Sequence, residues 1–222
     1  MSGKKSTLSQ RLFDQMYEDI LHLRLGLGQK LTLQSLAQRY QASITPIREA
    51  LSRLAEYGLV TYYSNCGVSV IDFTDEDIQD LFRFIGDLDA LAVLYCETSS
   101  RKPMLFFELE ETLSTGSRLL GVENREEWET YSRKFHKLFY DFAQSPCLAE
   151  ACNRFYPKLE LLTGLYSQEG KAAQTIQQEH EGIFQAIKDS GFSAGAQAMR
   201  CHLQQDMFLA LGAFRMRKDK SD

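Results

Sequence analysis

The segment from Ser43 to Leu54 constrains the fold more than any other part of the chain. Ser43 or Thr45 can cap the free backbone N–H groups at the start of a helix, and Pro46 suits a first-turn position. Apolar residues then recur at i, i+4 and i+7, which predicts one buried face, whereas Arg48 lies off that face. The predicted buried face comprises Ile47, Leu51 and Leu54. We therefore expect a helix with one packed side and one free polar side.

The segments on either side of this helix indicate a small domain of helices and a hairpin. Apolar spacing predicts a helix over residues 8–23 and a shorter one over 32–41. Runs of β-branched and aromatic residues over 59–63 and 68–71, separated by a turn, predict a β-hairpin. Three helices followed by a hairpin form a winged helix-turn-helix, in which the third helix enters the major groove of DNA. The sequence thus predicts a DNA-binding domain over residues 1–73.

The remainder of the chain shows helical patterns and no convincing strand. The acidic stretch 74–77 is predicted to be a linker, followed by an effector-binding and dimerisation domain over 78–216 and a tail over 217–222. The expected helices run over about 76–98, 103–121, 125–143, 146–167, 173–189 and 193–216. The predicted fold class is therefore mainly α, with an N-terminal winged helix-turn-helix and a C-terminal all-α helical bundle.

Composition excludes several other classes of protein. No apolar run approaches the roughly 20 residues that span a bilayer, and no apolar block of a signal peptide follows the N-terminus. The net charge is −5, with a slightly basic part before Phe73 and an acidic remainder, which permits a polyanion partner at the N-terminal domain. The 5 cysteines form no Cys-x-x-Cys pair, which favours free thiols. We expect a cytoplasmic protein without a membrane partner.

Several short patterns recur at fixed distances across the winged-helix segment. They are Leu36-Ala37, Ser43-x-Thr45-Pro46-x-Arg48-Glu49-Ala50-Leu51-x-x-Leu54, Gly58-Leu59-Val60 and Gly67-x-x-Val70. Together they resemble the GntR family of bacterial transcription regulators, and the resemblance implies contacts to double-stranded DNA. Carried over by position, the contacting residues are Gln34, Ser43, Thr45, Arg48 and Gly67. An intradomain ion pair of Arg48 with Glu49 or Glu56 is the alternative interpretation.

One position departs from this family pattern. Ile44 stands where the family usually has Arg. An isoleucine cannot neutralise a phosphate or bond a guanine edge. We therefore expect either a different operator or other groups that make this contact.

Three of the 4 histidines lie on predicted helices of the second domain. They are His136, His180 and His202. Imidazoles that converge inside a bundle suit a divalent transition metal such as Zn or Ni, because nitrogen donors at about 2.0 to 2.1 Å match these ions. Three unrelated surface or core histidines are the alternative, since spacing alone does not establish convergence.

The sequence around these histidines carries a second resemblance. The patterns are Phe135-His136-x-Leu138, His180-x-x-Ile183-x-x-Ala186-Ile187 and Ala198-Met199-x-x-His202-Leu203. They resemble the FCD type of effector-binding domain of one GntR subgroup, which implies an interior metal held by these histidines and by an Asp one turn before the first. Here that position is Ser132, so water or a ligand carboxylate would have to complete the shell.

The predicted effector pocket departs from the same pattern. Ile85 replaces an Arg that receives acidic effectors in relatives, and the nearby Arg83 points to a different face of its helix. Ser132 and Arg83 are the candidate pocket residues. An apolar or neutral effector, or a pocket filled by the protein's own Phe residues, both fit this pattern.

The leading interpretation is a ligand-responsive DNA-binding transcription regulator that is not an enzyme. It would bind a short palindromic operator as a homodimer, act as a repressor and respond to a small-molecule effector. One alternative is a metal-dependent enzyme that activates water with the three histidines, which requires a general base that no motif supplies. The other is a regulator whose bundle only dimerises.

Overall fold

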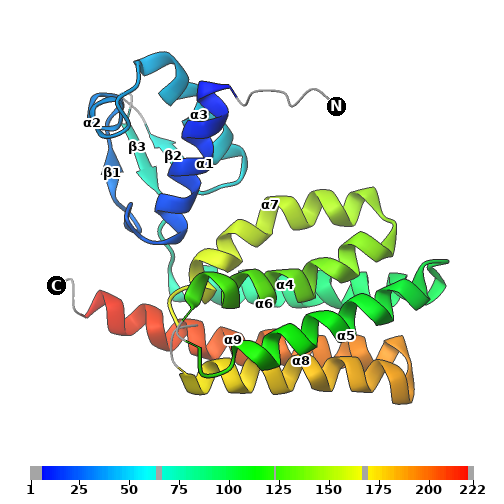
Figure 1. Ribbon diagram of the computed structural model, residues 1–222. Helices are drawn as coiled ribbons and strands as arrows, with labels where there is room; N and C mark the ends of the chain where they lie inside the picture. The colour runs from blue at the N-terminus through cyan, green and yellow to red at the C-terminus, as the bar shows by residue number, and fades with distance from the viewer. Residues whose placement is uncertain (1–6, 64–66, 123, 167–169, 220–222) are drawn as a thin grey trace. The chain divides into compact units, whose positions relative to one another are not determined.

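The chain folds into two structural units, and the boundary between them lies between Thr74 and Asp75 (Figure 1). The computed structural model describes residues 7–63, 67–122, 124–166 and 170–219. Most of the predicted hairpin turn at 64–67, together with Cys66, lies outside the described residues.

The first unit is a winged helix-turn-helix, as the sequence predicted. Its elements are α1 (Leu8–Leu21), β1 (Lys30–Leu31), α2 (Leu33–Arg39), α3 (Ile44–Glu56), β2 (Val60–Tyr63) and β3 (Gly67–Val70). The strands form an antiparallel sheet in the order β1-β3-β2, with Lys30 opposite Ser69 and Val60 opposite Val70. The sequence interpretation missed β1, because two residues are too few to show the alternation that marks a strand.

Local signals explain where the helices of this unit begin. The hydroxyl of Thr32 accepts a hydrogen bond from the backbone N–H of Ser35, and the Ser35 side chain bonds the backbone N–H of Thr32, which forms a capping box at α2. The apolar face of α3 packs against α1, whose Met16 and Ile20 are fully buried. The helix that carries the proposed DNA contacts is thus fixed from behind by apolar packing.

The second unit is an all-helical bundle. Its elements are α4 (Asp75–Tyr95), a 3-10 turn η1 (Cys96–Thr98), α5 (Lys102–Leu119), α6 (Arg125–Ala143), α7 (Pro146–Thr163), α8 (Gly170–Ser190) and α9 (Phe192–Lys218). Helix α4 packs against α6, α7 and, most extensively, α9, while α8 lies along α9 and α5 along α6 (Figure 1). The mainly α fold class is confirmed.

Helix α4 occupies most of the stretch predicted as a linker over 74–77. It begins at Asp75, and its first turn contains Asp75, Glu76 and Asp77. Carboxylates are favourable there because the N-terminal end of a helix carries a partial positive charge. The acidic run therefore starts the helix, and the division of the chain falls just before it.

The described residues contain neither a disulfide bond nor a membrane-spanning helix. The cysteines they contain are free, namely Cys96, Cys147, Cys152 and Cys201. No helix in the described part of the chain is long and apolar enough to cross a membrane.

We expect Ile47→Ala to lower the free energy of unfolding of the first unit by about 2 to 5 kcal/mol, because the fully buried side chain leaves a cavity. Ile44→Ala is the matched control, since Ile44 is 43% exposed on the same helix and its loss should cost less than about 0.5 kcal/mol. Urea unfolding followed by circular dichroism measures both, and fluorescence of Trp128 monitors the second unit separately. Equal losses for the two variants would contradict the packing described for α3.

Candidate metal centre and DNA-binding surface

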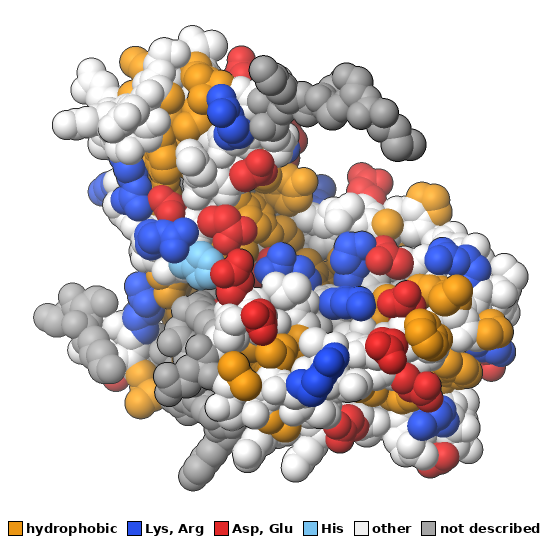
Figure 2. Space-filling model, viewed as in Figure 1, with side chains coloured by type: hydrophobic (Ala, Val, Ile, Leu, Met, Phe, Trp, Pro, Cys, Tyr) orange, Lys and Arg blue, Asp and Glu red, His pale blue; other side chains and the backbone are white. Residues whose placement is uncertain are grey.

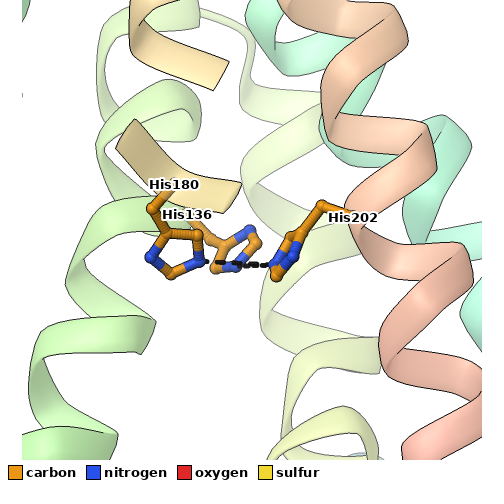
Figure 3. A group of neighbouring side chains, drawn as sticks. All are labelled: His136, His180 and His202. Atoms are coloured by element: carbon orange, nitrogen blue, oxygen red, sulfur yellow. Dashed lines mark hydrogen bonds between the residues drawn. The ribbon is translucent and has the colours of Figure 1, made fainter. Parts of the chain in front are cut away.

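Three histidines from three helices meet inside the second unit. His136 lies on α6, His180 on α8 and His202 on α9, and all are buried. The Nε2 atom of His202 lies 3.3 Å from Nε2 of His180 and 3.4 Å from Nε2 of His136. Figure 3 shows the three rings turned towards one another. The structure therefore brings together the three predicted ligand residues, which the sequence alone could not establish.

These spacings fit one metal ion. Four ligands arranged tetrahedrally at about 2.0 to 2.1 Å from a zinc ion lie about 3.3 to 3.4 Å from one another. Each of the three histidines offers one ligand atom within 4.8 Å of those of the other two. Lone pairs that face each other in a buried site repel unless a cation or a proton lies between them. The donor set and its geometry thus suit a divalent transition metal.

The outer nitrogen of each ring bonds a partner. Nδ1 of His136 lies 2.8 Å from Oδ2 of Asp89, and Nδ1 of His202 lies 2.7 Å from Oε2 of Glu179. A carboxylate can only accept, so each of these rings donates from Nδ1 and, when neutral, keeps a lone pair on Nε2. This arrangement of carboxylate, imidazole and open centre is the usual support of metal-binding histidines.

Asp89 is itself held by two tyrosines. Its carboxylate is buried on α4 and accepts hydrogen bonds from the hydroxyls of Tyr140 and Tyr156 at 2.5 to 2.7 Å. Burial, and next the negative charge of Asp89, raise the pKa of both tyrosines, so they remain protonated donors. These bonds offset part of the cost of burying the carboxylate and fix its orientation towards His136.

A hydrogen-bond relay sets the tautomer of His180. The side-chain nitrogen of Gln177 faces the carbonyl of Leu113 and the carboxylate of Glu181, which can only accept, so its oxygen faces Tyr131. The Tyr131 hydroxyl donates to that oxygen at 2.5 Å. Its own oxygen must then accept from Nδ1 of His180, 2.9 Å away. His180 is left with a free lone pair on Nε2, as the other two rings are.

Gly116 on α5 provides the space for this relay. A Cβ atom at Gly116 would lie 2.1 Å from Oε1 of Gln177 and 2.4 Å from Cζ of Tyr131. Such contacts are far shorter than van der Waals separations. Only glycine lets Tyr131 and Gln177 meet where they do.

The pKa values of His180 and His202 are shifted in opposite directions by their surroundings. Burial lowers the pKa of His180, and the neighbouring His202 and His136 lower it further, so that ring is neutral. Burial also acts to lower the pKa of His202, but the charges of Asp206 and Glu179 outweigh it and raise that pKa. A metal at Nε2 of His202 would therefore compete with a proton more strongly than at His180.

A second group of possible ligands overlaps the first. Glu179, His202 and Asp206 each offer an atom within 4.8 Å of the others. Burial raises the pKa of the Asp206 carboxyl, and the charge of His202 only partly opposes this. Sequence reasoning missed Asp89, Glu179, Asp206 and Tyr131. The i, i+4 spacing of His202 and Asp206 was a usable signal, whereas nothing in the sequence pairs Asp89 with His136.

The two candidate effector-pocket residues, Ser132 and Arg83, differ in burial and in position. Ser132 is half-buried on α6, one turn before His136. Arg83 is exposed on α4 and pairs with Asp80, so the structure does not place it with the histidines. Ile85 is fully buried in the bundle core. A role for Ser132 and Arg83 in effector binding stays a prediction.

The predicted DNA-contacting residues of the two helices are exposed. Gln34 lies on α2, while Thr45 and Arg48 lie on α3. Ser43 is the N-cap residue of α3, but its side chain makes no capping hydrogen bond. Its hydroxyl and the first N–H groups of α3 can therefore bond a phosphate, for which a helix N-terminus is well suited.

Arg48 differs from other arginines of this unit. Arg39 pairs with Asp19, and Arg53 bonds Gln10 and lies over the ring of Phe13. Among the described residues, no ion pair or hydrogen bond of the Arg48 side chain is found, so the predicted alternative of a bond to a neighbouring Glu has no support there. This cation is available for a partner.

The wing adds one residue that the sequence interpretation did not name. Tyr62 on β2 is exposed, and burial of part of its ring raises its pKa while the charge of Arg48 acts to lower it. Gly67 opens β3 opposite Tyr63, and a Cβ atom there would lie 1.9 Å from the Tyr63 ring. Gly67 thus has a packing role whether or not it contacts DNA.

Comparison with known proteins agrees with this architecture. Residues 8–70 match the bacterial regulatory proteins of the gntR family, and residues 80–205 match the FCD domain. The HTH-type transcriptional regulator YdhC of Bacillus subtilis is 26% identical over 199 residues, which cover 88% of each chain. The HTH-type transcriptional repressor RspR of Escherichia coli is 20% identical over 215 residues, covering 97% of this chain and 92% of RspR.

A solved structure shares the fold. E. coli McbR/YncC superposes with a TM-score of 0.72 at 18% identity, covering 96% of this chain and 100% of the other. The chain belongs to the GntR family of bacterial transcription regulators, in the group that carries an FCD domain. It is a DNA-binding regulator and not an enzyme, as the sequence predicted.

We expect Gly116→Ala to lower the free energy of unfolding of the second unit by about 1 to 3 kcal/mol, because the added methyl group overpacks the Tyr131–Gln177 contact. Gly182→Ala is the matched control, since it also lies within a helix but its Cβ would meet nothing within 4 Å. The control should be neutral or stabilising by up to about 1 kcal/mol. Urea unfolding followed by Trp128 fluorescence compares them, and equal effects would exclude a steric role for Gly116.

Proposed function

We propose that this regulator is a homodimeric, ligand-responsive repressor that binds a short palindromic operator and holds a divalent metal in its FCD domain. The observation that carries the proposal is the convergence of three buried Nε2 atoms, each with its ring oriented from the outer nitrogen. The relative RspR is a transcriptional repressor, which supports repression as the mode of regulation.

The DNA-binding surface is proposed to combine α3 with the wing. Ser43, Thr45 and Arg48 lie at the exposed start of α3, and Tyr62 is exposed on β2 of the wing, where the charge of Arg48 acts on its hydroxyl. Arg48 can bond a base edge or a phosphate, while the hydroxyls suit phosphate contacts that set the register. Ile44 is 43% exposed at the same end, where it can contact only apolar groups such as a thymine methyl.

Dimerisation is proposed to use the bundle. Phe84, Leu91 and Tyr95 are exposed on α4 at spacings that place them on one face of the helix. Hydrophobic side chains also lie among charged ones on the face of the second unit that Figure 2 presents. Exposed apolar stripes of this kind favour association, and a two-fold dimer matches a palindromic operator.

The metal is proposed to link the effector site to the helices. It would supply a Lewis-acidic centre that binds an anionic or electron-donating group of a ligand. His136, His180 and His202 would hold it, and Asp89, Glu179 and the Tyr131 relay would keep their rings in place. An effector that reaches this centre would then act on α6, α8 and α9 together. A bundle that only dimerises would bind neither metal nor effector.

We expect Arg48→Ala to weaken operator binding and to reduce the slope of log affinity against log salt by about 0.9 if the contact is to a phosphate. A base contact would instead cost about 1 to 3 kcal/mol and relax specificity at one position. The operator is found by selecting bound fragments of the source genome, and inverted repeats are expected among them. Arg83→Ala removes the same charge from the second unit and should leave affinity unchanged. An unchanged affinity and salt slope for Arg48→Ala would exclude its role.

We expect the purified chain to contain about one divalent transition metal per subunit by elemental analysis. Added Zn²⁺ or Ni²⁺ should stabilise chelator-treated protein by about 2.7 kcal/mol at a free concentration a hundred times its Kd. His202→Ala should abolish both results. His22→Ala, at the histidine outside the site, should change neither. A wild-type chain without stoichiometric metal and without a thermal shift would exclude the metal centre.

A further inference from the structure

The three carboxylates around the histidines approach them from different sides. Asp89 and Glu179 bond the outer Nδ1 atoms of His136 and His202. Asp206 instead lies on the inner side, with Oδ2 at 3.7 Å from Nε2 of His202. The Asp206 carboxylate therefore lies on the Nε2 side of His202, the side on which that ring approaches His136 and His180, as an outer support would not.

The local structure of α9 explains this placement. His202 and Asp206 are four residues apart on the same helix, so their side chains lie on one face. The distance of 3.7 Å is close to the 3.3 and 3.4 Å that separate the Nε2 atoms. Asp206 shares a group of candidate ligand atoms within 4.8 Å with His202 and Glu179 and is not in the group of the three histidines, so its side chain has to turn towards His136 and His180 to become a fourth ligand.

The energetics of burial support the same role. The Asp206 side chain is 8% exposed, and neither its Oδ1 atom nor Oε1 of Glu179 has a hydrogen-bond partner of normal geometry among the described residues, although the Tyr166 hydroxyl acts on the Asp206 carboxyl and lowers its pKa. A buried carboxylate without such bonds is costly, and a bound cation offsets the cost. Three neutral imidazoles also leave the charge of a divalent ion uncompensated, which an anionic fourth ligand reduces.

We propose that Asp206 supplies the carboxylate ligand of the metal centre, in place of a carboxylate from α6, where Ser132 offers only a hydroxyl. This inference rests on the metal centre proposed above. Three nitrogens and one oxygen from the protein would give a bound ion the four ligands that zinc usually takes, and an effector would have to compete with Asp206 or add a further ligand.

Cobalt(II) binding to the full-length chain tests the proposal, because Co²⁺ reports its ligands in its visible spectrum. We expect Asp206→Asn to weaken Co²⁺ binding more than tenfold and to change the d–d bands. Asp189→Asn, on the exposed end of α8, is the matched control and should behave as wild type. Circular dichroism of the metal-free variants establishes that each is folded.

A cysteine substitution separates a direct ligand from an outer support. Asp206→Cys should add a thiolate-to-cobalt charge-transfer band that is absent from the wild type, whose own cysteines provide the baseline. Ser132→Cys should not add this band. If wild type binds Co²⁺ but Asp206→Asn binds it equally with the same spectrum, or only Ser132→Cys gives the band, Asp206 is not a ligand. If wild type binds no Co²⁺, the metal centre itself is overturned, and Asp206 with it.

Discussion

The second unit depends on keeping three imidazole rings buried with their Nε2 atoms directed at one point. Burial disfavours a charged ring, and an unbonded ring nitrogen in the interior costs free energy. The bundle meets both demands with a hydrogen-bond partner behind each ring, drawn from α4, α6 and α8. Since the rings themselves come from α6, α8 and α9, the packing of these helices and the chemistry of the centre cannot vary independently.

The DNA-binding unit could be predicted almost entirely from the sequence, because its signals are local. Apolar spacing, the cap at Thr32 and the β-branched runs each act within one element, and the structure places the elements accordingly. The two-residue strand β1 could not be predicted, since its pairing with β3 is set by the fold and not by its own residues. The acidic run after Thr74 favours a linker when judged by its charge alone, but carboxylates also favour the start of a helix, and α4 begins there.

Of the candidate metal centre, only the three histidines could be predicted from the sequence. His136, His180 and His202 could be named because they stand in recognisable patterns, but their convergence required the packing of three helices. Asp89 is 47 residues from His136, and no local pattern connects residues so far apart. Asp206 stands four residues after His202 on α9, a spacing visible in the sequence, but the family pattern places its carboxylate at the position of Ser132 instead. The role of Arg83 in effector binding stays a prediction, since Arg83 is exposed and pairs with Asp80.

Gly116 has a consequence beyond its own helix. It contributes no ligand and no hydrogen bond from a side chain, yet the volume it leaves free decides which nitrogen of His180 carries the proton. A search for conserved donor atoms would pass over it. A design that transfers the three histidines to another bundle would also need a glycine at the position of Gly116. A methyl group there would separate Tyr131 from Gln177, and the His180 ring could then take either tautomer.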